Sequence, residues 1–145
     1  MESKEYKKQA LRTNTPDIEG VSQRILNGFS KDSKKVINLT VTHEKAKAKI
    51  DLLHASMGLV TEAGEFQDAL KKHFFYGKEL DLVNLKEEIG DCLWYCAVAL
   101  DALGTDFEAV MQTNINKLNA RYPEKFSEDQ AINRDVAAER EILKK

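Results

Sequence analysis

The chain has 145 residues, and we expect one domain over residues 1–145. Hydrophobic residues make up 42% and charged residues 32%, a composition that fits a soluble globular protein. The 22 basic and 24 acidic side chains give a net charge of −2, so we expect no nucleic acid partner, because such partners usually require a strongly basic surface.

The cysteines and the apolar runs indicate in which cellular compartment the protein is expected. Cys92 and Cys96 are four residues apart on one predicted helix, so we interpret them as small buried hydrophobes and not as a disulfide. The N-terminal residues are polar, and the longest apolar run, Cys92 to Leu100, is far shorter than the ~20 residues that span a bilayer. We therefore expect a reduced, cytoplasmic protein with no membrane partner.

The first third of the chain predicts little beyond two short helices. Residues 4–13 favour an amphipathic helix that ends at Asn14-Thr15-Pro16, and Thr15 is placed to cap a second helix reaching about Phe29. Residues 30–42 favour no single structure. We treat residues 1–41 as an N-terminal extension and about 42–122 as the core that carries the motifs.

A long helical pattern then runs from about Thr42, a plausible N-cap, to Phe75, and it ends before Tyr76-Gly77-Lys78. Glycine inside a helix costs about 1 kcal/mol relative to alanine. Gly58 and Gly64 therefore need a reason, such as the close approach of a ligand or of another helix.

The next helix is predicted from about Asn84, with Glu87 completing a capping box, to Leu103 before Gly104. It is apolar on all sides from Cys92 to Leu100, so it should be central or lie at a subunit interface. Capping boxes at Thr105 and Ser127 then predict a helix to about Arg121 and a peripheral helix at about 127–143. The predicted fold class is all-α, a helical bundle with antiparallel central helices.

Two acidic turns stand out in the two central helices. Glu62 and Glu65 lie three residues apart in the first, and Glu88 and Asp91 lie three residues apart in the second. Each pair shares one helix face, and no Lys or Arg lies three or four residues from any of the four. Unpaired carboxylates are costly to bury unless they are neutralised or bind a metal. Single acidic pairs of this kind are common on helix surfaces, but two unpaired pairs beside apolar residues and glycines favour a shared cation.

The type of ligand narrows the choice of metal. Mg²⁺ prefers oxygen ligands and is usually held by a few carboxylates together with substrate phosphates. A carboxylate-bridged di-iron bundle would instead need Glu-x-x-His motifs, and the residues three before His43, His54 and His73 are Thr40, Asp51 and Leu70. The sequence therefore predicts a magnesium site.

Phosphate groups need cations, which the acidic turns lack. Lys117 and Arg121 share one helix face, with Asn114 one turn earlier and Tyr122 adjacent. Phosphate binding and a cationic helix end that complements the helix dipole explain this group about equally well. Trp94 and Tyr95, which follow Asp91, are candidates for stacking on a base, although aromatic residues are more often part of a core.

At this point the residues resemble a known family. The segments LVTEAGEFQDALKK and NLKEEIGDCLWY are similar to the MazG-type all-α nucleoside triphosphate pyrophosphohydrolases, whose signature is EExxE followed by ExxD. Thr61 replaces the first acid of that signature. The segment NINKLNARYP, from Asn114, resembles a motif of single-domain, often phage-borne members, and the resemblance covers about residues 50–135.

The resemblance implies Mg²⁺-dependent hydrolysis of an NTP or dNTP to the monophosphate and pyrophosphate, with Mn²⁺ as a possible substitute. It implies that Glu62, Glu65, Glu88 and Asp91 are the metal ligands and catalytic residues, with Glu62 or Glu65 accepting the proton of the attacking water. Lys117 and Arg121 would hold the phosphates, with Asn114, Tyr122 and Trp94 also binding substrate and Lys71, Lys72 and Lys78 as weaker candidates. Family members typically form homodimers or homotetramers with sites near the subunit interfaces.

Two alternatives share the same fold. A dUTP or phosphoribosyl-ATP pyrophosphohydrolase would perform the same chemistry on a narrower substrate. A non-catalytic helical bundle that binds a partner would show no Mg²⁺-dependent stabilisation by nucleotides, whereas an enzyme should be stabilised according to its ligand occupancy.

Overall fold

A computed structural model describes residues 1–14, 20–21 and 43–144. These residues form helices joined by turns and contain no strand, so the predicted all-α fold class is confirmed. The chain divides into two compact units, Met1–Gly104 and Thr105–Lys145, each described by itself. Most of the predicted second helix, the segment 30–42 and the cap at Thr42 lie outside the described residues.

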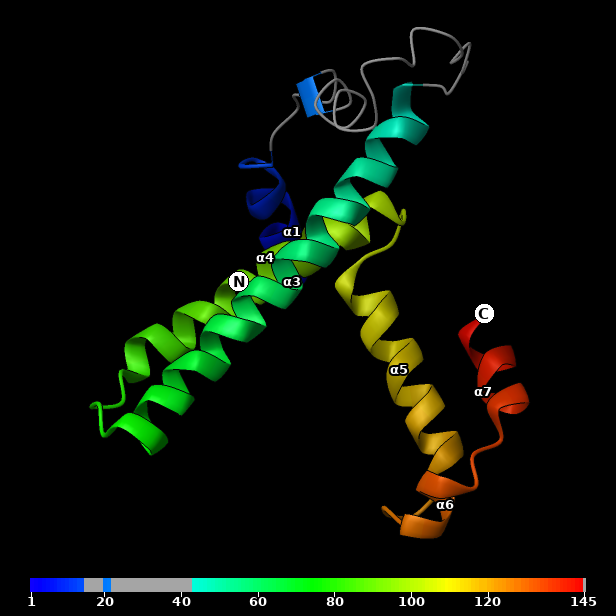
Figure 1. Ribbon diagram of the computed structural model, residues 1–145. Helices are drawn as coiled ribbons and strands as arrows, with labels where there is room; N and C mark the ends of the chain where they lie inside the picture. The colour runs from blue at the N-terminus through cyan, green and yellow to red at the C-terminus, as the bar shows by residue number, and fades with distance from the viewer. Residues whose placement is uncertain (15–19, 22–42, 145) are drawn as a thin grey trace, which may run out of the picture. The chain divides into compact units, whose positions relative to one another are not determined.

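The first unit is built on a helical hairpin (Figure 1). Helix α3 (His43–Tyr76) runs out to a turn, and α4 (Leu82–Ala102) returns antiparallel along it. A short N-terminal helix, α1 (Ser3–Leu11), packs against α4. The predicted extents of α1 and of the two central helices agree with these bounds to within about two residues. The N-terminal extension thus contributes one helix to the unit that carries the acidic turns.

The turn between α3 and α4 is fixed by backbone bonds. Gly77 has a positive φ of 67°, its N–H donates to the carbonyl of His73 at 3.2 Å, and the N–H of Lys78 donates to the carbonyl of Lys72 at 3.2 Å. The bond from Gly77 to His73 is that of the αL motif, in which glycine takes the left-handed conformation that ends a helix. His73 adds a side-chain bond, because its Nδ1 lies 2.8 Å from the carbonyl oxygen of Lys78.

The start of α4 differs from the predicted one. The carboxylate of Asp81 accepts hydrogen bonds from the backbone N–H groups of Val83 and Asn84, at 2.9 and 3.1 Å, so the helix begins at Leu82. Asn84 does not act as the N-cap, and its side chain is used elsewhere. A carboxylate three residues upstream is a good N-cap, which explains the difference.

The hairpin closes through small residues. The buried apolar residues of this unit are Ala10, Ala55, Ala97, Val98 and Leu100. A Cβ added at Gly58 would lie 2.1 Å from Cε1 of Tyr95, so the ring of Tyr95 occupies the space that the glycine leaves. The expectation of a close approach at Gly58 is confirmed, and the approaching group is a side chain of α4. At Gly64 nothing lies within 4 Å of such a Cβ.

Much of the hairpin's apolar surface is exposed in the single chain. On α3, Leu53, Met57 and Val60 are 51%, 62% and 73% exposed and recur at the spacing of one helix face. On α4, Ile89 and Leu93 are 52% and 44% exposed and lie four residues apart. Two apolar stripes therefore stand uncovered by the described residues of this chain.

The second unit contains three helices, α5 (Phe107–Arg121), α6 (Glu128–Ile132) and α7 (Val136–Leu143). Asp106 caps α5 in place of the predicted Thr105, and Ser127 caps α6 as predicted. The single peripheral helix predicted at 127–143 is two helices, because α6 ends at Ile132 and Asp135 caps α7 by accepting a hydrogen bond from the N–H of Ala138. No helix among the described residues has both the length and the apolar character to cross a membrane.

Candidate metal site

The acidic turns of α3 and α4 meet on the hairpin. Glu62, Glu65 and Glu88 each place one carboxylate oxygen within 4.8 Å of the others. Glu62 and Glu65 share a face of α3 because they are three residues apart, and the antiparallel return of α4 brings Glu88 beside them. Three predicted ligands, from two helices, thus lie close enough to share one cation.

Glu88 is the most buried of the three, with 6% of its surface exposed. Its Oε1 accepts a hydrogen bond from the side-chain amide of Asn84, one turn earlier on α4. An amide donor fixes the orientation of the carboxylate that accepts from it. Sequence reasoning placed Asn84 at the helix start and missed this role, although its spacing of four residues from Glu88 is a usable signal.

Glu62 is half-buried, and its pKa is raised. Burial is the largest cause, and the negative charges of Glu65, Asp91 and Glu88 add to it, while a hydrogen bond from Thr61 acts in the opposite direction. The hydroxyl of Thr61 lies 3.3 Å from Oε1 of Glu62 and 2.9 Å from the carbonyl oxygen of Gly58. The residue that departs from the acidic signature therefore contacts one of the clustered carboxylates.

Asp91 lies at the edge of the cluster. It is exposed, and it is not among the three residues whose carboxylate oxygens lie within 4.8 Å of one another. Its charge nevertheless raises the pKa of Glu62. Burial and then the charge of Asp91 also raise the pKa of Tyr6, whose hydroxyl donates to the carbonyl of Gly90 at 3.2 Å. Helix α1 therefore reaches the end of the site marked by Asp91, which sequence reasoning did not anticipate.

The donor set suits a hard divalent cation. All three clustered groups are carboxylates, and one of them is buried and held by an amide donor. Mg²⁺ and Mn²⁺ favour oxygen ligands of this kind. The residues present therefore fit the metal that the acidic turns predict.

A pocket of about 180 Å³ extends from the cluster to the turn that joins α3 and α4. Glu65 and Glu88 lie at one end of it, and Lys78 lies in the turn. The remaining lining residues come from the C-terminal part of α3, from the connecting turn and from the first turn of α4: Asp68, Ala69, Lys72, Glu79, Asp81 and Asn84. Two of the weaker candidate cations, Lys72 and Lys78, thus share a pocket with two of the predicted metal ligands.

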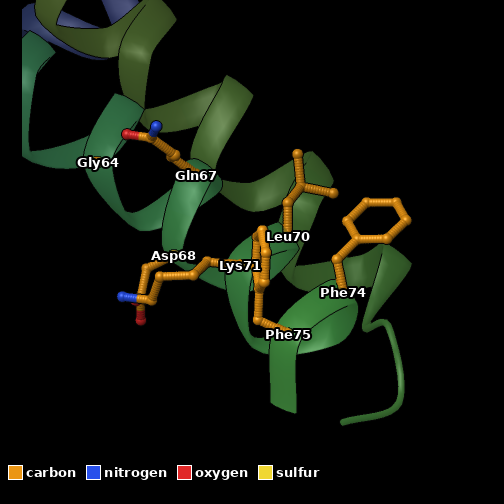
Figure 2. A pocket seen from close by; sticks show the side chains of 7 residues that line it. All are labelled: Gly64, Gln67, Asp68, Leu70, Lys71, Phe74 and Phe75. Atoms are coloured by element: carbon orange, nitrogen blue, oxygen red, sulfur yellow. The ribbon is translucent and has the colours of Figure 1, made fainter. Parts of the chain in front are cut away.

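A second hollow, of about 590 Å³, is lined by α3 (Figure 2). Lys71 extends along it with its ammonium beside the Asp68 carboxylate, which also pairs with Lys72. Phe74 and Phe75 lie at its end and are 74% and 78% exposed. All its lining residues come from one helix (Gly64, Gln67, Asp68, Leu70, Lys71, Phe74 and Phe75), so the described residues form one wall of it.

Trp94 makes contacts with α1. Its indole N–H lies 3.0 Å from the carbonyl oxygen of Ala10 and 2.8 Å from Oγ1 of Thr13. Its ring also packs against Tyr95, with centroids 4.8 Å apart, and against His54 at 6.0 Å. The indole nitrogen therefore holds α1 on α4, and stacking of the ring on a base stays a prediction.

The predicted phosphate-binding group lies in the second unit. Asn114 is exposed, Lys117 is half-buried, and the Arg121 guanidinium stacks over the ring of Tyr122 at 5.6 Å. Arg121 also donates from Nε and Nη2 to the carboxylate of Glu139, at 2.7 and 2.6 Å. Arg121 is thus committed to an ion pair with α7 here, and the binding role of this group stays a prediction.

Comparison with known proteins agrees with this geometry. The family model described as the MazG nucleotide pyrophosphohydrolase domain matches residues 53–126. The chain is also similar to the Gene 37 protein of Mycobacterium phage L5, with 36% identity over 77 residues. That match covers 48% of this chain and 65% of the phage protein, slightly less than two thirds of the relative's length. No solved structure matches the chain significantly.

Proposed function

Because the chain belongs to the MazG nucleotide pyrophosphohydrolase domain family, we propose that it hydrolyses a nucleoside or deoxynucleoside triphosphate to the monophosphate and pyrophosphate with the help of Mg²⁺. The observation that carries this proposal is the cluster of Glu62, Glu65 and Glu88 within 4.8 Å, inside the matched residues. An acidic cluster of this geometry on a hairpin suits a site that handles a metal-bound polyphosphate.

Glu62, Glu65 and Glu88 would hold the divalent ion, with Asp91 as a fourth ligand from the next turn of α4. When bound, Mg²⁺ or Mn²⁺ neutralises phosphate charge and lowers the pKa of a coordinated water. The side-chain amide of Asn84 donates a hydrogen bond to Glu88 and so orients its carboxylate toward the site. The protein's own contribution is therefore to fix three or four oxygen ligands along one side of the substrate.

The reaction requires a proton acceptor. The water oxygen forms a bond to the α-phosphorus, the bond from that phosphorus to the α,β-bridging oxygen breaks, and pyrophosphate leaves with the electron pair. Glu62 or Glu65 would accept the proton of the water, because both carboxylates lie in the cluster.

The remaining predicted residues complete the substrate site in this proposal. Lys117 and Arg121, from this chain or from a neighbouring subunit, would contact phosphate oxygens, with Asn114 and Tyr122 beside them on α5, and Trp94 would lie under the base. Arg121 must exchange Glu139 for phosphate to act in this way. A change of carboxylate for phosphate preserves the bidentate geometry that a guanidinium prefers.

We further propose that the active form is a homodimer or a homotetramer. The apolar stripes of α3 and α4, with residues such as Met57 and Val60 more than 60% exposed, are the support for this. Contiguous exposed apolar surface commonly marks a protein interface. A second copy would cover these stripes and would also close the open side of the hollow in Figure 2.

The test is to incubate the protein with each NTP and dNTP plus Mg²⁺ and to identify the products. Monophosphate and pyrophosphate are expected, and a strong preference for one base would identify a narrower enzyme, such as a dUTP pyrophosphohydrolase. Diphosphate with inorganic phosphate, or no turnover of any substrate, would contradict the proposal.

A matched variant links the activity to the cluster. Glu65→Gln should reduce turnover to the background rate and abolish stabilisation by Mg²⁺ and nucleotide, because it removes a metal ligand that is exposed and contributes little to packing. Its helicity by circular dichroism should equal that of the unsubstituted protein. Full activity in Glu65→Gln would remove the metal site from the proposal.

A further inference from the structure

The pocket that joins the acidic cluster to the α3–α4 turn has a direction. Glu65 and Glu88 lie at its inner end, Lys72 lies two helical turns further along α3, and Lys78 lies in the turn itself. A linear anion bound to a metal at the inner end and extending along this pocket reaches the lysines next.

The outer part of the pocket contains its two cationic side chains, Lys72 and Lys78. Asp68 is shared by the ammonium groups of Lys71 and Lys72, so these three side chains together carry one positive charge. Among the described residues, Lys78 pairs with no carboxylate. The carboxylate of Asp81 is occupied by the N-terminal N–H groups of α4. The third acid of the outer part, Glu79, is exposed.

The position of Lys78 is set by the turn and not by chance. Its N–H is bonded to the carbonyl of Lys72, and its carbonyl accepts a hydrogen bond from Nδ1 of His73 at 2.8 Å. A carbonyl can only accept, so the Nδ1–H tautomer of His73 is the one present. The backbone of Lys78 is therefore held on both sides, which keeps the root of its side chain at the mouth of the pocket.

The opposite end of the acidic cluster has a different chemistry. Asp91 adds another negative charge there, and the aromatic side chains of Tyr95, His54 and Trp94 pack together one turn beyond it. Aromatic surroundings suit a nucleoside.

We propose that Lys78, with Lys72, binds the β- and γ-phosphates of the substrate, so that pyrophosphate leaves toward the Gly77 turn and the nucleoside lies on the Asp91 side. This inference rests on the proposed function and adds the orientation of the substrate and two binding residues to it. His73 is a positioning residue in this arrangement, because it acts through the backbone of Lys78.

The experiment measures the binding of inorganic pyrophosphate and of each of the four deoxynucleoside monophosphates by calorimetry in the presence of Mg²⁺. Loss of one charge-assisted phosphate contact weakens binding by about tenfold or more, so Lys78→Gln should do so for pyrophosphate. The same variant should leave monophosphate binding unchanged. Lys78→Arg, which keeps the charge, should restore pyrophosphate binding, and Lys86→Gln, an exposed lysine of α4 outside the pocket, should have no effect.

A positioning role for His73 has its own readout. Asparagine places an amide donor near the position of Nδ1, so His73→Asn should retain pyrophosphate affinity, whereas His73→Leu should weaken it with no loss of monophosphate binding. Equal weakening of both ligands in His73→Leu would show a general structural effect and would overturn the positioning role.

The outcomes separate the two proposals. Unchanged pyrophosphate binding in Lys78→Gln, with normal turnover in the unsubstituted protein, would overturn the orientation and leave the proposed function standing. Weakened monophosphate binding with unchanged pyrophosphate binding would show the reverse orientation and would also overturn it. If the unsubstituted protein neither binds pyrophosphate nor turns over any nucleotide, both proposals are wrong.

Discussion

Glu88 owes its orientation to Asn84, a side chain on the same helix that a motif search would pass over. The side-chain amide of Asn84 donates a hydrogen bond to Oε1 of Glu88, whose carboxylate belongs to the cluster. Thr61 plays a comparable part beside Glu62, where a hydroxyl stands in place of a further acid. At the scale of single residues, the site therefore depends on two neutral donors as well as on its carboxylates.

This dependence predicts a measurable effect of Asn84→Ala. Loss of the group that orients a metal ligand typically lowers metal affinity or activity by about 10–100-fold. We expect a reduction of that size in the Mg²⁺ dependence of turnover, with the fold retained. Asn116→Ala, an exposed asparagine on α5, is the matched control and should change nothing. Equal Mg²⁺ dependence in both variants would show that Glu88 needs no amide partner.

At the scale of the elements, the ring of Tyr95 on α4 packs directly against Gly58 of α3. A methyl group at position 58 would meet the Tyr95 ring at 2.1 Å, which is less than any real contact allows. The ring belongs to a half-buried side chain that also packs against His54 and Trp94, so it has little freedom to move. The spacing of α3 and α4 near the acidic cluster is set here.

Two glycine substitutions should therefore have opposite effects. Gly58→Ala should lower the free energy of unfolding by about 1–3 kcal/mol, the usual effect of overpacking. Gly64→Ala meets nothing within 4 Å and should raise it by up to about 1 kcal/mol, because alanine is the better helix former. Thermal or urea melts of both variants test this, and equal stability of the two would contradict the packing described.

The contact between α5 and α7 predicts a dependence on pH. Hydrogen bonds from Arg121 and then from Arg134 lower the pKa of Glu139 to about 2, from an ordinary value of 4.5. A carboxylate whose pKa is lower in the folded state than in the unfolded state stabilises the fold at pH values above its unfolded-state pKa. That contribution is lost as the pH falls from about 4.5 through about 2.

The measurement is the helicity of the full chain during thermal melts between pH 7 and pH 2. Glu139→Gln should lower the melting temperature at pH 7 and should reduce the fall in melting temperature between pH 7 and pH 2. Glu141→Gln, an exposed acid paired with Lys144, is the control and should follow the unsubstituted protein. Identical pH profiles for the two variants would show that the ion pair does not hold α7.

The helices themselves were largely predictable, because apolar periodicity is a local signal. The helix caps were less predictable. Asp81 caps α4 and Asp106 caps α5, each within three residues of the predicted caps Asn84 and Thr105. The break at Asn133 lies inside a continuous polar pattern. The convergence of Glu62, Glu65 and Glu88 followed from spacing and a short turn. The contacts of Tyr6 and Trp94 with partners 84 residues away depend on the docking of α1, which no local pattern encodes.

At the scale of the whole molecule, the main feature is the pair of exposed apolar stripes on the hairpin. Among the described residues, those buried in the first unit are mostly small, while Leu53, Met57 and Val60 face outward on α3. A single chain therefore leaves uncovered some of the surface that would normally form a core. The proposed oligomer accounts for this distribution.

A charge placed in a stripe should disrupt the assembly. Met57 is 62% exposed in the single chain, so Met57→Glu should leave the chain folded while shifting the protein to smaller species. The measurement is molar mass by light scattering during size-exclusion chromatography. Ser56→Glu adds the same charge at the adjacent exposed position and should retain the assembly. A monomeric mass for the unsubstituted protein would contradict the oligomer at once.

The docking of α1 also has a practical consequence for anyone preparing this protein. Ser3 already belongs to that helix, and Tyr6 and Ala10 bond to α4 beside the acidic cluster. An affinity tag fused to the first residue would therefore begin close to the acidic cluster, and removal of residues 1–13 would take away both hydrogen-bond acceptors of the Trp94 indole. Samples intended for kinetic work are better handled from the opposite terminus.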